Sequence, residues 1–149
     1  MHDALEFEWL PEFELGHGAM DDTHREFVDL VNTLLQSDDA ELPAALSAFS
    51  DHARRHFAEE DRWMVTTAYA SAGCHVDEHA KVLKSLEEVK DALVQGRSHV
   101  VRAFGQALAD WFPEHAQVMD QGLARWLVQQ RLGGSPVVFR AREAVSAED

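Results

Sequence analysis

Four stretches of the chain place apolar residues three and four positions apart, as amphipathic α-helices do. In the first stretch Phe27, Val31 and Leu34 follow this pattern, and polar residues occupy the positions between them. The pattern predicts helices over residues 21–35, 42–66, 75–95 and 98–131. Short connections between four amphipathic helices favour an all-α fold, an up-down-up-down four-helix bundle.

Local signals indicate where these helices begin and end. The carboxylate of Asp21 or Asp22 can cap the first helix by accepting a hydrogen bond from a free first-turn N–H group. Gly96 suits the end of the third helix, because glycine readily adopts the backbone conformation that stops a helix. Pro113 has no N–H group to donate, so we expect an interruption of the fourth helix near it.

The predicted organisation is one bundle with an extension at each end. The boundaries are an N-terminal arm over residues 1–20, the bundle over 21–132 and a C-terminal tail over 133–149. The arm has no sustained helical period, and we expect its aromatic residues Trp9 and Phe13 to pack over the core.

Composition and charge narrow the function classes. Hydrophobic residues make up 46% of the 149 residues, enough for one buried core. The formal net charge of −14 repels nucleic acid and anionic lipid, and no apolar run approaches the roughly 18 residues that span a bilayer. The first residues lack the basic region of a secretory signal. We therefore expect a cytoplasmic protein with no nucleic-acid or membrane partner.

A single cysteine, Cys74, excludes an intramolecular disulfide and any cysteine-rich metal site. Its thiol adjoins His75 near the predicted start of a helix, a place that could lower a thiol pKa. We nevertheless expect Cys74 to be a small buried thiol without a redox role.

Polar residues interrupt the apolar face of every predicted helix. Residues four apart lie about 40° apart around a helix axis, so each four-residue pair shares a face. A single pair of polar residues with this spacing is common by chance, but in this chain such residues occur on all four predicted helices. The set consists of His24, His56, Glu60, His75, His79, His115 and Asp120. The last two are five apart, about 140° on an ideal α-helix, so Asp120 is expected to reach across.

Burying five imidazoles and two carboxylates is costly unless they share a charge partner, and a pair of metal ions provides one. Imidazole and carboxylate ligands without thiolate suit iron, manganese or zinc. Seven ligands exceed the needs of a tetrahedral zinc site. Two octahedral metals with bridging carboxylates would use all seven and leave one metal with an open position for a small molecule.

The segments ELGHGAMDDTHREFVDLVN, HFAEEDRWM, HVDEH and WFPEHAQVMD carry a further signal. In their order and spacing they resemble the hemerythrin family, including its bacterial members, over residues 9–127. The resemblance implies two iron ions joined by an oxo or hydroxo group. One iron would be held by His75, His79 and His115, the other by His24 and His56, and both would be bridged by Glu60 and Asp120.

By the same resemblance, O2 or another small diatomic molecule would bind at the open position of the second iron, in an apolar pocket lined by Phe57, Trp111 and Phe112. Five neutral imidazoles favour reversible binding over the oxidation chemistry of carboxylate-rich di-iron sites. The expected function is non-enzymatic O2 carriage, storage or sensing. The alternatives are a di-iron redox enzyme that reduces peroxide, nitric oxide or O2, and an iron-dependent regulatory protein.

The remaining polar residues are expected outside the site. His17 is expected at the surface or just behind the ligands, and His2, His52 and His99 in solvent. Glu78 falls on the predicted solvated face of the third helix.

Overall fold

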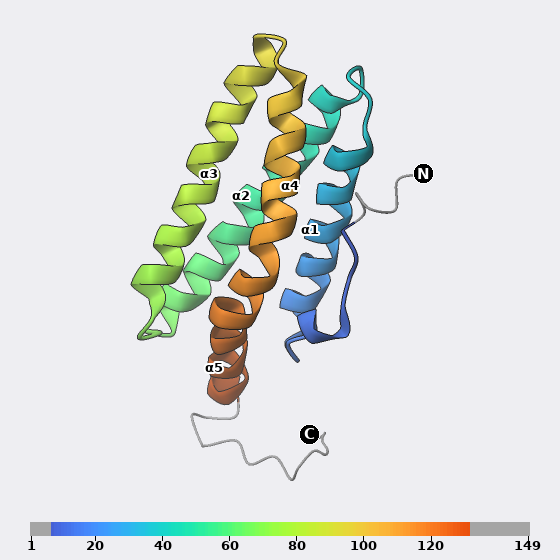
Figure 1. Cartoon of the computed structure of the whole chain (residues 1–149). Helices are drawn as coiled ribbons and strands as arrows, with labels where there is room; N and C mark the ends of the chain where they lie inside the picture. The colour runs from blue at the N-terminus through green and yellow to red at the C-terminus, as the bar shows by residue number, and fades with distance from the viewer. Residues whose placement is uncertain (1–6, 132–149) are drawn as a thin grey trace.

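The computed structural model describes residues 7–131, and that part of the chain contains helices and no strands (Figure 1). The four long helices run alternately up and down and are α1 (Gly18–Gln36), α2 (Leu42–Thr66), α3 (Ala72–Val94) and α4 (Ser98–His115). The shorter elements are a 3-10 turn η2 (Pro11–Phe13), a π-helical turn η3 (Ala116–Asp120) and α5 (Gln121–Arg131). The predicted all-α four-helix bundle is confirmed.

The first helix begins three residues earlier than predicted, and its cap is a different residue. The imidazole Nδ1 of His17 accepts the N–H of Met20 at 3.2 Å. Neither Asp21 nor Asp22 caps the helix, so that expectation was wrong. The buried Asp21 carboxylate instead accepts the N–H of Leu15 at 2.8 Å, which ties the preceding segment to the helix.

The third helix also begins three residues before its predicted start, at Ala72. Its end follows the prediction. Gly96 has a φ of +83°, the left-handed region that favours glycine. The N–H of Arg97 then donates to the C=O of Ala92 at 2.9 Å, which satisfies a carbonyl of the last helical turn.

The predicted interruption near Pro113 takes the form of a change in helix type. The chain passes Pro113 as part of α4 and only then becomes the π-helical turn η3. The N–H of Gln121 donates to the C=O of Ala116, five residues back, which is the bond that defines a π-helix. The helix continues beyond it as α5, so the two parts follow one another along the same side of the bundle (Figure 1).

Two apolar clusters fill the bundle and leave a polar layer between them. The larger cluster includes Phe27 and Phe112, and the smaller one includes Met20, Met64 and Leu123. The arm aromatics cover the larger cluster as expected: Phe13 is 1% exposed and Trp9 is half-buried. No helix within residues 7–131 is long and apolar enough to cross a membrane. The predicted C-terminal tail lies outside the described residues.

Candidate metal centre

The polar layer consists of the seven side chains that the sequence singled out. Each lies on the inner face of its helix between the two apolar clusters, and none is more than 5% exposed. They form two groups whose ligand atoms lie within 4.8 Å of one another. One group is Glu60, His75, His79, His115 and Asp120, and the other is His24, His56 and Glu60.

Glu60 belongs to both groups because its two oxygens face opposite ways. Oε1 lies 3.2 Å from Nε2 of His79 and 3.5 Å from Nε2 of His75. Oε2 lies 2.9 Å from Nε2 of His56 and 3.4 Å from Nε2 of His24. A carboxylate placed in this way can bind one cation through each oxygen.

Asp120 has the same divided arrangement. Its Oδ1 lies 2.9 Å from Nε2 of His75 and 3.3 Å from Nε2 of His115, while its Oδ2 lies 3.1 Å from Nε2 of His24. The π-helical turn explains how Asp120 reaches this place. A π-helix has more residues per turn than an α-helix, so residues five apart, such as His115 and Asp120, come closer to one face.

Most of the nitrogen and oxygen atoms that this cluster offers to a metal are left without hydrogen-bond partners. Among the described residues, every buried side-chain nitrogen or oxygen without a hydrogen bond belongs to one of the seven, except Nε2 of His52. Buried polar atoms in folded proteins are normally paired, so a cluster of unpaired donors and acceptors needs an explanation. Cations held between the imidazole nitrogens and the carboxylate oxygens would satisfy them, and the residues therefore fit a metal pair.

The comparison with protein families also indicates cation binding. Residues 15–127 match the family model described as "Hemerythrin HHE cation binding domain". The chain belongs to the hemerythrin family. A Ralstonia nicotianae bacteriohemerythrin is 34% identical over 123 residues, which cover 83% of this chain and 90% of that protein. A Methylococcus capsulatus bacteriohemerythrin is 26% identical over 114 residues, which cover 74% of this chain and 87% of that protein.

Solved structures of hemerythrins share the fold. The crystal structure of a hemerythrin mutant with alanine in place of a leucine superposes with a TM-score of 0.69 at 26% identity. The match covers 76% of this hemerythrin-family chain and 91% of the other. It supports the bundle architecture and the order of the helices that carry the polar layer.

The charges of the cluster are strongly coupled. Burial lowers the pKa of His24, but the carboxylates of Asp120 and Glu60 outweigh it and raise the pKa to about 10. In the same way, the carboxylates of Asp120 and Glu60 outweigh the effect of burial on His75 and raise its pKa to about 9. Burial acts to raise the pKa of Glu60, yet the imidazoles of His56, His24 and His75 hold it well below its usual range. Without metal, protons on imidazoles therefore balance the buried carboxylates.

Two of the histidines also have carboxylate partners on their far sides, which the sequence analysis missed. Nδ1 of His79 lies 2.8 Å from Oδ1 of Asp61, and Nδ1 of His115 lies 3.2 Å from Oε1 of Glu78. Metal-ligating histidines commonly donate their second N–H in this way, which fixes the ring and its tautomer. Glu78 is half-buried rather than fully solvated as expected, because α4 brings His115 and Trp111 against it.

Aromatic rings enclose the polar layer. Phe57 stacks on His79 with centroids 4.1 Å apart, and Trp111 stacks on His115 at 4.2 Å. Phe112 meets the ring of His24 edge-on at 5.2 Å. The three predicted pocket residues therefore lie against the cluster. A fourth ring, Phe27, stacks on Phe112 and was not predicted for this role.

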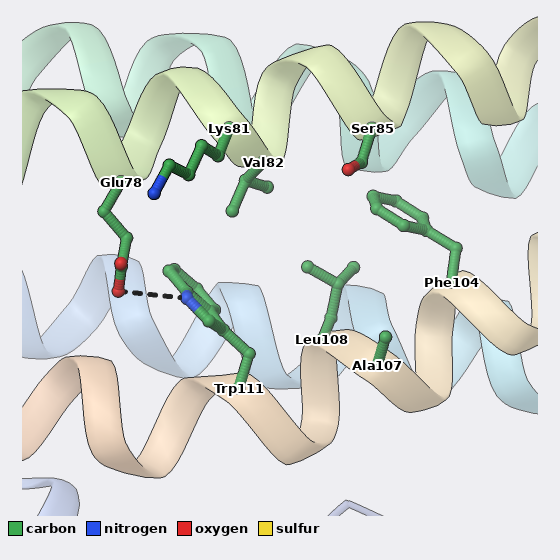
Figure 2. A pocket seen from close by; sticks show the side chains of 8 residues that line it. All are labelled: Glu78, Lys81, Val82, Ser85, Phe104, Ala107, Leu108 and Trp111. Carbon is green, nitrogen blue, oxygen red and sulfur yellow. Dashed lines mark hydrogen bonds between the residues drawn. The ribbon is translucent and has the colours of Figure 1, made fainter.

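A surface pocket of about 270 Å³ lies beside Trp111, between α3 and α4 (Figure 2). Its walls include Val82, Phe104 and Leu108, and at one end the indole N–H of Trp111 donates to Glu78 at 3.2 Å (Figure 2). Because the same indole stacks on His115, it separates this pocket from the polar layer.

The other expectations had mixed outcomes. His99 is exposed as expected, and His2 lies outside the described residues. His17 is buried against Trp63 rather than at the surface, and burial lowers its pKa. His52 was expected in solvent but is 2% exposed, because α1 covers it. Cys74 was expected to be buried but is exposed, because the earlier start of α3 turns it outward.

Proposed function

We propose that this hemerythrin-family chain holds two iron ions in its polar layer and binds O2 reversibly there, without catalysing a reaction. His75, His79 and His115 would hold one iron, and His24 and His56 the other. Glu60 and Asp120 would join the two irons, alongside an oxo or hydroxo group. Two irons so placed would supply the electrons that bind O2 and recover them on its release.

The observation that carries the proposal is the division of each carboxylate between two groups of imidazoles. A network of buried ion pairs, or a single cation shared among all seven side chains, would not require this division of the carboxylates. In this cluster Glu60 and Asp120 each direct one oxygen to each side. This arrangement supports two metal positions that share both carboxylates.

The unequal number of imidazoles supports a vacancy at one position. Three imidazoles accompany the carboxylates on one side and two on the other. The side with two is that of His24 and His56, and Phe112 and Phe57 lie against these rings. Apolar walls favour O2, which is itself apolar, and exclude the water that would otherwise promote irreversible oxidation.

Metal analysis tests the ligand assignment. The purified protein should contain two irons per chain, and Glu60→Ala should lose both because it removes a ligand from each. His79→Ala should retain at most one. The matched control is His99→Ala, which removes an exposed imidazole and should keep both irons. If Glu60→Ala keeps two irons per chain, the assignment is wrong.

A further inference from the structure

The buried imidazole of His52 has no role in the site described so far. It lies on α2 one helical turn before His56, and their ring centroids are 5.4 Å apart. Phe27 of α1 covers it at 6.4 Å. His52 is not within either group of potential metal ligands. His52 is therefore a buried histidine that lies beside a proposed metal ligand but is not itself one, and its role depends on what its two ring nitrogens contact.

Two neighbouring nitrogens in this region are buried and unpaired. They are Nε2 of His52 and Nδ1 of His56. No backbone carbonyl accepts from Nδ1 of His56, including that of the preceding helical turn. Buried nitrogens of neutral imidazoles are costly unless each has a partner, and the two rings that carry these nitrogens lie with their centroids 5.4 Å apart.

The other nitrogen of each ring fixes which one donates. Nε2 of His56 faces Oε2 of Glu60 at 2.9 Å, on the metal side, so its proton belongs on Nδ1 when a metal is bound. Nδ1 of His52 lies 3.4 Å from Oε1 of Glu26 on α1. A proton on that nitrogen would face the Glu26 carboxylate, and the backbone of Thr23 on α1 is a further hydrogen-bond partner of this ring. With the proton on Nδ1, Nε2 of His52 is an acceptor.

We propose that His52 is a positioning residue for His56: its Nε2 accepts the Nδ1–H of His56 through one bound water. The inference rests on the proposed function, since His56 is taken to be an iron ligand. It gives His56 the outer partner that Asp61 provides for His79 and Glu78 for His115. The partner of His56 is a neutral ring, which draws its proton less strongly than a carboxylate does.

One test uses the unaltered protein. The ¹⁵N spectrum of its imidazoles reports which nitrogen of His52 carries the proton. We expect the proton on Nδ1 and a bare Nε2. A proton on Nε2 of His52 in the metal-loaded protein would leave this ring unable to accept and would overturn the proposal, and this measurement needs no variant.

The second test measures the affinity for Fe(II), without O2, by competition with a chelator. His52→Leu removes the acceptor, and we expect the affinity at one of the two iron positions to fall about tenfold. His52→Gln offers a carbonyl oxygen as acceptor and should restore most of that loss, which a purely structural role would not predict. His99→Leu is the matched control and should bind as the unaltered protein does.

The outcomes separate this proposal from the one on which it rests. If the unaltered protein binds no Fe(II), the proposed function fails and the role of His52 falls with it. If it binds two Fe(II) and His52→Leu binds both as tightly, only the role of His52 is overturned. The same holds if His52→Gln loses as much affinity as His52→Leu.

Discussion

Metal loading should expel protons from the polar layer. In the metal-free protein His24, with a pKa of about 10, and His75, with a pKa of about 9, are both protonated at pH 7. Glu60 and Asp120, whose pKa values lie below their usual range, carry no proton to release. Since a metal binds the neutral imidazole, loading at pH 7 should release about two protons per chain from these two histidines.

The same protonation sets the pH dependence of affinity. Each proton displaced makes the binding constant tenfold larger per pH unit, so two protons give a hundredfold rise, or about 2.7 kcal/mol. The affinity for Fe(II) should therefore rise with this slope from pH 7 to about 8.5. At higher pH the affinity for Fe(II) should become independent of pH, because both imidazoles lose their protons even when no metal is bound.

Anaerobic titration with Fe(II) in a weakly buffered solution containing a pH indicator measures the release directly. His24→Gln removes one of the two protonated imidazoles and should reduce the release by about one proton per chain. His99→Gln, an exposed control, should leave it unchanged. Release of less than one proton at pH 7, or an affinity that does not change with pH, would refute the electrostatic account.

Three further predictions concern the metal-free fold and the surroundings of the site. Because folding raises the pKa values of His24 and His75, their protonation stabilises the metal-free fold fully below pH 6.5, and this stabilisation is lost as the pH rises through 9 to 10. The Tm of the metal-free protein should therefore fall between pH 7 and 10, and a constant Tm would contradict this. Asp61→Leu should lower Fe(II) affinity about 10- to 100-fold in chelator competition, Asp61→Asn should lower it less, and equal losses would count against a hydrogen bond to His79. A Cβ on Gly122 would lie 2.7 Å from the Tyr69 hydroxyl, so Gly122→Ala should stabilise the fold in urea by less than the roughly 1 kcal/mol expected of alanine in a helix. In a Tyr69→Phe background the same substitution should stabilise the fold more, and an equal effect in both backgrounds would contradict the contact.

Much of the fold and the core of the site could be predicted, because both depend on periodicity along single helices. The apolar stripes set the four helices, and a polar residue on such a stripe must point inward. The five-residue step from His115 to Asp120 could not be resolved in this way. It depends on the π-helical turn, whose bonds involve the backbone from Ala116 to Gln121 and leave no distinct pattern in the side chains.

The missed residues share one physical cause. Glu78 lies outside the apolar stripe of α3, and His52 lies at the edge of the α2 stripe, on the side that faces α1. Whether such a residue is solvated depends on the neighbouring helix. Trp111 and His115 of α4 meet Glu78, and Phe27 of α1 covers His52. A pattern read along one helix does not contain this information.

The most direct test of the central claim is the visible absorption spectrum of the iron-loaded protein, reduced without O2 and then exposed to air. Reversible O2 binding predicts a visible band that forms with O2, is lost under vacuum and returns on re-exposure. Rapid conversion to a stable ferric spectrum that vacuum does not reverse would contradict reversible binding and favour a redox enzyme. A protein that takes up no iron would contradict the metal centre itself.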